Sequence, residues 1–160
     1  MRFDRILIAL DDSRQAESAL DAGIALAEAV HGKVLLVHVV NPAVAYAGTG
    51  DLLVSDLLVD LRRQGEELLL RARMRSGETV PKEVALLEGP APREIIQAAT
   101  EWECDLIVLG THGRGRVASF IMGSTAQEVI RDAPCPVLAV PGRPMTVERG
   151  AANRLAESAR

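Results

Sequence analysis

The sequence predicts an α/β fold in which helices cover both faces of an open, parallel β-sheet. Strand-like and helix-like segments alternate along the chain, which is typical of right-handed βαβ units. The strand-like runs are almost continuously apolar, as expected for strands buried on both sides. Aromatic residues make up only 2% of the chain, so we expect a core of Leu, Val, Ile and Ala.

The first half of the chain supplies two strands and two helices. Asp11, Asp12 and Ser13 follow the first apolar run and favour a helix start. His31 and Gly32 indicate the end of that helix, because glycine is common just past a helix end. The predicted elements are a strand at 5–10, a helix at 16–30, a strand at 33–40 and a helix at about 52–75.

The second half continues the alternation with three strands and two helices. Gly89 and Pro90 end the third strand, and Pro92 suits the first turn of the helix that follows. A glycine-rich loop separates the fourth strand from the last helix. We expect strands at 82–88, 106–109 and 136–140, and helices at 92–102 and 126–131.

The composition limits the class of protein. With 160 residues, 48% hydrophobic and 25% charged, the chain suits one globular domain, which we place at residues 1–141, followed by a polar, flexible tail at 142–160. A formal net charge of −4 argues against nucleic acid as the main partner. We find no signal-peptide pattern and no run long enough to span a bilayer, so we expect no membrane contact and a cytoplasmic location.

The loop from Gly110 to Thr125 carries the clearest functional signal. Gly110, Gly113 and Gly123 allow a backbone to approach a phosphate closely, because glycine lacks a Cβ. The following helix would offer N–H groups and a positive dipole end to an anion. The loop is not a P-loop, since Arg116 and Val117 stand where Lys and Ser or Thr are required, and it follows the fourth strand rather than the first, unlike a dinucleotide fingerprint.

Several of these residues have simpler interpretations. Ser124 and Gln127 fit a capping box, which starts a helix in any protein. Asp11 and Asp12 suit helix capping and ligand contact equally well. We interpret His38 as a hydrogen-bonded core residue. His112, Arg114 and Arg116 have the character of surface residues, although Arg114, between two glycines, is also a candidate for phosphate contact.

The two cysteines, Cys104 and Cys135, have no CxxC or metal-ligand spacing. We expect them to be reduced and to behave as small apolar residues that are buried or half-buried.

Taken together, these segments resemble the universal stress protein family. Gly110, Gly113, Gly123 and Ser124 fill the spacing G-x2-G-x9-G-[ST], which resembles the nucleotide-binding signature of that family. The end of the first strand, the second strand, Glu88-Gly89-Pro90, the fourth strand and the last strand also resemble their counterparts, in the same order. The resemblance extends over nearly all of the chain up to Pro141.

The resemblance implies a Rossmann-like, five-stranded parallel sheet in the order 3-2-1-4-5 and a bound ATP. Asp12 departs from the family pattern, which has glycine or another small residue there, and this charge would narrow the pocket mouth or repel an anion. The family also implies a homodimer through the last strand, Val137–Val140, and an unpaired edge strand independently suits such pairing. The implied ATP-contacting residues are Ala9, Asp11, Val39, Leu109, Gly110, Gly113, Gly123, Ser124 and Thr125, with Arg114 favouring phosphate.

The sequence supports ATP binding better than ATP turnover. Hydrolysis needs a metal-holding carboxylate and a residue that orients water. Asp11 and Asp12 are the carboxylates we place near the site, and we assign no catalytic and no metal-ligating residue, although Mg²⁺ commonly accompanies ATP phosphates. The leading hypothesis is a stress-response or regulatory module with an unidentified protein partner. A slow ATPase or nucleotide-transfer enzyme, and a nucleotide-free interaction dimer, are the alternatives.

Overall fold

The computed structural model describes residues 2–43, 51–111 and 122–142, in which five parallel strands form one sheet in the order β3-β2-β1-β4-β5. Both the α/β class and the strand order agree with the prediction. The strands are β1 (Arg5–Ala9), β2 (Lys33–Val40), β3 (Lys82–Glu88), β4 (Leu106–Gly110) and β5 (Val137–Val140). The helices are α1 (Arg14–Val30), α3 (Asp51–Arg75), α4 (Ala91–Glu101) and α5 (Ser124–Asp132).

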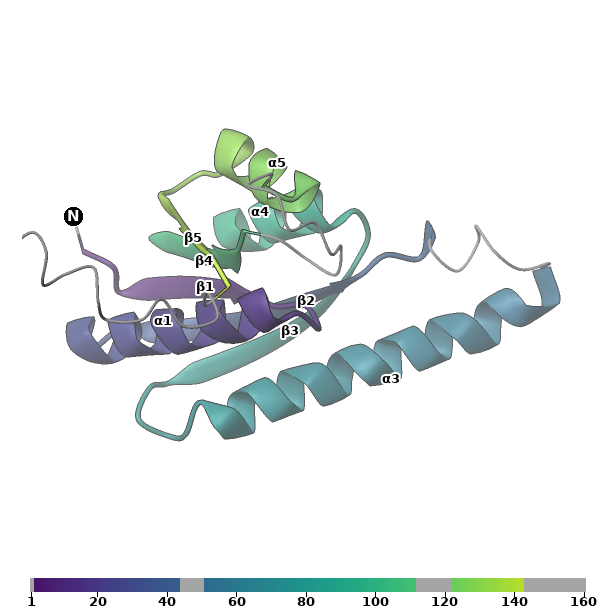
Figure 1. Ribbon diagram of the computed structural model, residues 1–160, viewed down its shortest axis with the longest axis horizontal. Helices are drawn as coiled ribbons and strands as arrows, with labels where there is room; N and C mark the ends of the chain where they lie inside the picture. Colours follow the sequence, from purple (N-terminus) through teal and green to yellow (C-terminus); the bar gives the residue numbers. More distant parts are fainter. Residues whose placement is uncertain (1, 44–50, 112–121, 143–160) are drawn as a thin grey trace, which may run out of the picture.

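The sheet separates two apolar layers, with α1 and α3 on one face and α4 and α5 on the other (Figure 1). Alternate residues of each strand enter alternate layers, as strand geometry requires. In β1, Ile6 and Ile8 pack toward α1 and α3, whereas Leu7 packs toward α4 and α5. All three are fully buried, which accounts for the unbroken apolar run that predicted this strand.

The direction of chain progression reverses between β1 and β4. From β1 the chain adds β2 and then β3 on one side, and it returns to add β4 and β5 on the other. In open parallel sheets such a reversal leaves a crevice outside the carboxyl ends of the two central strands, where ligands commonly bind. The segments that follow β1 and β4 are therefore candidates for a ligand-binding site.

The end of α1 differs in detail from the sequence-based expectation. His31, not Gly32, takes the left-handed conformation, with φ 54°, and donates its N–H to Ala27 and Glu28 carbonyls. Gly32 is required for another reason, because a Cβ at this position would lie 2.9 Å from the carbonyl oxygen of Phe3. Glycine here permits close packing of the backbone rather than an unusual φ.

The last helix also begins earlier than predicted. The apolar pattern indicated a helix at 126–131, but α5 runs from Ser124 to Asp132. Its first residues are Ser and Thr, which carry no apolar periodicity, so the pattern could not reveal this turn. The predicted tail lies, from residue 143 onward, outside the described residues.

At the amino edge of the sheet, the segments that lead into the strands contact one another closely. Asp105 accepts the N–H groups of Asp4 and Arg5 on one carboxylate oxygen, at 3.0 and 2.9 Å. The Trp102 ring lies 4.8 Å from the Arg5 guanidinium carbon and 5.4 Å from the Lys33 ammonium nitrogen. These contacts join the entrances of β1, β2 and β4.

Candidate functional site

The strands end at different positions along the carboxyl edge of the sheet, which gives this edge a step. The apolar residues predicted to contact the ligand lie there. β1 ends at Ala9, which pairs with Val37 of β2 and Leu109 of β4, whereas β2 continues to Val40. Ala9, Val39 and Leu109 all pack on the α4/α5 face, where Leu109 is buried and the other two are half-buried. The structure thus places three predicted site residues on the same face of the same edge.

Asp11 lies directly beyond the end of β1 and organises the turn into α1. Its Oδ1 accepts the N–H of Ser13 at 3.2 Å and also the Ser13 hydroxyl. The Ser13 Oγ in turn accepts the N–H of Ala16 at 3.1 Å, so Ser13 is the N-cap of α1. The capping interpretation of Asp11 and Asp12 is therefore wrong. Asp11 orients the cap, and Asp12 is exposed.

His38 secures the backbone just before Asp11. This histidine is 8% exposed, and its Nδ1 donates to the Leu10 carbonyl at 2.7 Å. The Leu10 N–H donates to the Val37 carbonyl at 2.8 Å, which extends the pairing of β1 and β2 beyond Ala9. The prediction of a hydrogen-bonded core histidine is confirmed, and the contact fixes the point from which Asp11 projects.

The two ends of the glycine-rich loop meet at the carboxyl end of β4. The Gly123 N–H donates to the Thr111 carbonyl at 2.8 Å, and the Thr111 N–H donates to the Val140 carbonyl at 3.0 Å. The chain thus leaves and re-enters the sheet edge at one point, beside α5. Gly113 and Arg114, together with His112 and Arg116, lie outside the described residues.

Gly110 is explained by packing against α1. A Cβ at this position would lie 2.8 Å from the Cβ of Gln15 and 3.1 Å from its carbonyl carbon. The first distance is shorter than real Cβ contacts, and the second is tight against backbone that cannot easily move. The glycine therefore lets the end of β4 approach the first turn of α1, whatever else it contacts.

The N-terminus of α5 presents backbone donors. Gly123 is its N-cap, with φ −61° and ψ 150°, and provides no side chain to accept a hydrogen bond. Gln127 N–H donates to the Gly123 carbonyl at 3.0 Å, which closes the first helical turn. Within the described part of the chain, the N–H groups of Ser124, Thr125 and Ala126 have no acceptor, as is usual for a first turn without a side-chain cap.

The predicted capping box is consequently wrong. Ser124 is the first helical residue rather than the N-cap, and the Gln127 side chain donates to the Met122 carbonyl at 2.7 Å. The backbone conformation of Gly123 is open to any residue, so conformation alone does not require glycine there. Met122 and Thr111 both brace this turn, and no signal in the sequence singled them out.

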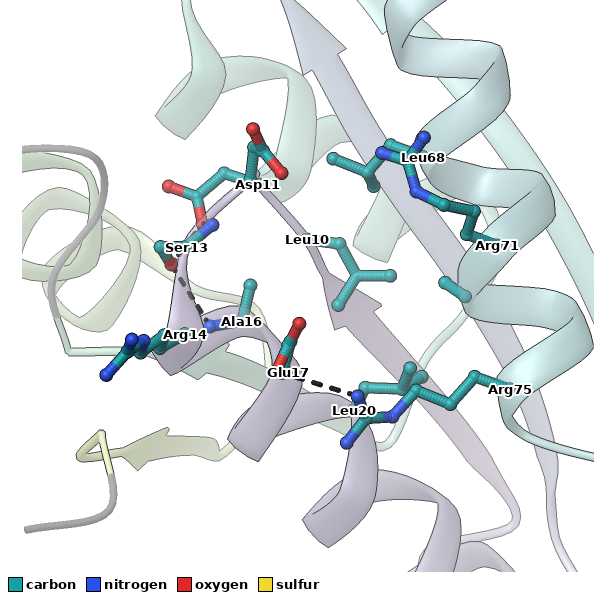
Figure 2. A pocket seen from close by; sticks show the side chains of 12 residues that line it. Leu10, Asp11, Ser13, Arg14, Ala16, Glu17, Leu20, Leu68, Arg71 and Arg75 are labelled. Carbon is teal, nitrogen blue, oxygen red and sulfur yellow. Dashed lines mark hydrogen bonds and ion pairs between the residues drawn. The ribbon is translucent and has the colours of Figure 1, made fainter. Parts of the chain in front are cut away.

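A cavity of about 340 Å³ opens beside Asp11 on the opposite, α1/α3 face of the sheet (Figure 2). Leu10, Leu20 and Leu68 form an apolar wall, and charged side chains surround it. Arg75 pairs with Glu17 at 3.5 Å and with Asp21 at 3.1 Å, which links α3 to α1. Asp11 therefore lies at the carboxyl edge of the sheet and also borders this cavity.

Within residues 2–43, 51–111 and 122–142, no group of three or more His, Cys, Asp or Glu side chains lies close enough together to hold a metal ion. No helix in the same ranges is long and apolar enough to cross a membrane.

Comparison with known proteins agrees with the fold. The model of the universal stress protein family matches residues 2–141. The chain belongs to the universal stress protein family. A universal stress protein of Thermus aquaticus is 39% identical over 139 residues, which cover 86% of this chain and 98% of the relative.

Solved structures of the family are similar over almost the same length. A family member from Burkholderia pseudomallei is 32% identical, with a TM-score of 0.71 over 87% of this chain and 96% of its own. The universal stress protein of Archaeoglobus fulgidus, solved in complex with dAMP, is 27% identical, with a TM-score of 0.60 over 88% of this chain and 99% of its own.

Proposed function

We propose that this universal stress protein binds ATP in the crevice between β1 and β4 and acts as a stress-response module whose partner contacts depend on the nucleotide. The observation that carries the proposal is the first turn of α5, whose backbone donors lie at the same sheet edge as Asp11. The related protein from Archaeoglobus fulgidus, which was solved with an adenine nucleotide, supports this ligand class.

The adenosine half of ATP would lie against the step in the sheet. Ala9, Val39 and Leu109 offer an apolar surface on the α4/α5 face, and Val39 lies beyond the end of β1. Asp11 Oδ1 is occupied by Ser13, but Oδ2 has no partner among the described residues. A carboxylate oxygen with this freedom suits a ribose hydroxyl, which can donate to it.

The phosphates would lie at the N-terminus of α5. The N–H groups of Ser124, Thr125 and Ala126 are donors there, and the positive end of the helix dipole favours an anion. Gly123 adds no side chain to the approach, and its hydrogen bond to Thr111 holds the turn in place. From the family resemblance we assign Gly113 and Arg114 to the same phosphates, with Mg²⁺ as their companion.

This arrangement favours binding over hydrolysis. Asp11 and Asp12 are the carboxylates that follow β1, and Asp11 already uses one oxygen to orient the cap of α1. Phosphoryl transfer requires a held metal ion and an oriented water, in addition to a phosphate cradle. We therefore assign the nucleotide a regulatory role, in which its bound state alters the contact with a protein partner.

We also propose that the module is a homodimer that pairs through β5. This strand is at the edge of the sheet and has β4 as its partner on one side. Leu138 is 38% exposed, and Ile130 on neighbouring α5 is 43% exposed. An unpaired edge with apolar side chains suits pairing with a second copy.

Calorimetric titration of ATP into variants at this edge tests the ATP site. Gly123→Val places a side chain in the path of the phosphates, and we expect affinity to fall about 100-fold, equivalent to losing one or two hydrogen bonds to a charged group. Asp11→Asn preserves an acceptor for Ser13 but removes charge from the ribose contact, and we expect a loss of about 10-fold. Asp12→Asn is the matched control, because Asp12 is exposed, and its affinity should be unchanged or slightly higher.

Circular dichroism must first show that each variant melts as a folded protein. Unchanged ATP affinity in both Gly123→Val and Asp11→Asn would contradict the site. Steady release of ADP by the wild type, lost in Asp11→Asn while binding remains, would instead favour an ATPase. No binding of any adenine nucleotide by the wild type would favour the interaction dimer.

A further inference from the structure

Two cysteines far apart in the sequence meet at the amino edge of the sheet. The Sγ atoms of Cys104 and Cys135 are 3.4 Å apart, although 31 positions separate the residues. Cys104 precedes β4 and is 8% exposed, whereas Cys135 precedes β5 and is half-buried. The expectation of buried or half-buried cysteines is confirmed, but their spacing in the sequence gave no indication that the two sulfur atoms are in contact.

The backbone holds each sulfur in a defined position. Glu103 adopts φ 49°, and the Cys104 N–H then donates to the Ala99 carbonyl at 2.9 Å, a common helix-ending arrangement. Cys135 lies between Pro134 and Pro136, whose rings restrict the chain on both sides. The Ile107 N–H donates to the Pro136 carbonyl at 3.0 Å, which ties the two segments together.

We propose that Cys104 and Cys135 form a reversible intramolecular disulfide, a covalent modification at the edge of the sheet opposite the nucleotide crevice. A disulfide bond is about 2.05 Å long, so the sulfur atoms need to approach by only about 1.4 Å. Since both are already fixed by the fold, little conformational entropy is lost when the bond forms. This modification is independent of the proposed nucleotide.

The oxidant would be a low-molecular-weight disulfide, and the exchange balances as two steps. The Cys135 thiolate attacks one sulfur of the small disulfide, forms a mixed disulfide and releases one small thiolate. The Cys104 thiolate then attacks Cys135 Sγ, closes the protein disulfide and releases the second thiolate. The two protons lost by the cysteines go to the two released thiolates, so two protein thiols are oxidised and one small disulfide is reduced.

Burial controls the rate of this reaction. Burial raises the pKa of the Cys104 thiol well above its usual range, and burial also raises the pKa of Cys135. Both groups are therefore protonated at neutral pH, and the thiolate is the reactive form. We expect slow oxidation that accelerates from about pH 7 to about pH 9, with Cys135 reacting first because it is more exposed.

The disulfide would enclose β4, both ends of the glycine-rich loop and α5 within one covalent ring. A ring of this length reduces the entropy of the unfolded chain, and we expect the melting temperature to rise by roughly 5–10 °C. The Thr111–Gly123 hydrogen bond lies inside the ring, near the opposite end of β4 from the sulfurs. The native backbone is therefore constrained at the amino edge, while the crevice keeps its geometry.

The test compares the purified full chain before and after exposure to oxidised glutathione, with reduction by dithiothreitol as the reversal. Intact mass should show the loss of two hydrogen atoms without an added glutathione, and peptide mapping should join the segments containing Cys104 and Cys135. The melting temperature should rise and return to its starting value after reduction. Cys135→Ser and Cys104→Ala each remove one thiol, and neither should show a rise in melting temperature on oxidation.

Any one of four results would overturn the proposal. The first is complete labelling of both cysteines by a maleimide, in protein that was oxidised while folded and then denatured, which would show that no bond had formed. A glutathione adduct that persists on Cys135 while Cys104 stays reduced is the second such result, and a disulfide that joins two chains is the third. If the bond formed without any rise in melting temperature, the ring would not constrain the fold as argued.

Discussion

The two edges of the sheet use their polar groups in opposite ways. At the amino edge, polar and aromatic groups contact one another, as when Asp105 accepts two backbone N–H groups and the Trp102 ring contacts Arg5 and Lys33. At the carboxyl edge, the first turn of α5 and one oxygen of Asp11 have no partner within the part of the chain that the structure describes. The first edge stabilises the fold, and the second leaves hydrogen-bonding capacity for a ligand.

Chain topology accounts for this division. Parallel strands all enter at one edge and leave at the other, so the entering segments can pack against one another. The reversal between β1 and β4 sends the departing segments to opposite sides, and in sheets of this kind it commonly leaves a ligand-binding crevice. Changes at the amino edge should therefore affect stability with little effect on nucleotide affinity, and changes at the carboxyl edge should show the reverse unless they alter packing.

The largest effect on stability is expected from Asp105→Ala. This change removes the acceptor of two partly buried N–H groups, and we expect unfolding free energy to fall by about 2–4 kcal/mol. Urea unfolding measures the loss, and Asp12→Ala is an exposed control with little expected change. ATP affinity of Asp105→Ala should match the wild type at a temperature where the variant is folded. A strong loss of affinity would mean that the two edges are coupled.

Two glycines at the carboxyl edge should differ in how much their substitution destabilises the protein. Gly110→Ala should destabilise the protein by about 1–3 kcal/mol, because the new Cβ meets Gln15. Gly123→Ala should cost only about 0.5–1 kcal/mol, since its φ of −61° suits alanine but alanine is a weaker N-cap. Thermal unfolding separates the two. Equal losses would show that Gly123 is also a packing glycine, which would weaken its assignment to phosphate.

A smaller difference in stability is expected between substitutions of the two serines at helix starts. Ser13→Ala removes the side chain that caps α1 and should cost about 1 kcal/mol. Ser124→Ala should leave stability within about 0.5 kcal/mol, because Gly123 is the N-cap of α5. Chemical unfolding of both variants provides the measurement. A cost at Ser124 as large as that at Ser13 would restore the predicted capping box.

Sequence patterns were sufficient to predict the structure where a single physical cause acts over several residues. The apolar runs of β1 and β4 follow from burial on both faces, so the strands and the layers could be predicted. The alternation of elements implied a parallel sheet, and the chain reversal then placed Asp11 and Gly110 at one edge. His38 was also interpreted correctly, because a polar residue within a buried strand must find a partner.

Sequence patterns failed to predict the structure where the environment of a residue depends on a segment distant in the sequence. The pattern did not reveal that Gln15 on α1 requires glycine at position 110, and the predicted ligand contact of Gly110 stays a prediction. Ser124 matched a capping box, yet the bond from Gly123 to Thr111 sets the helix start one residue earlier. The meeting of Cys104 and Cys135 likewise depends on the turn after α4 and on the pairing of β4 with β5. Such contacts have no local signature.

The most direct test is an NMR titration of the labelled full chain with ATP. We expect the backbone N–H signals of Ser124, Thr125 and Ala126 to shift most, with those of Asp11 and Ser13 next. The N–H signals of Asp4 and Arg5, which Asp105 holds at the amino edge, should remain in place. Shifts confined to the amino edge or to the α1/α3 cavity, with the first turn of α5 unchanged, would contradict the account.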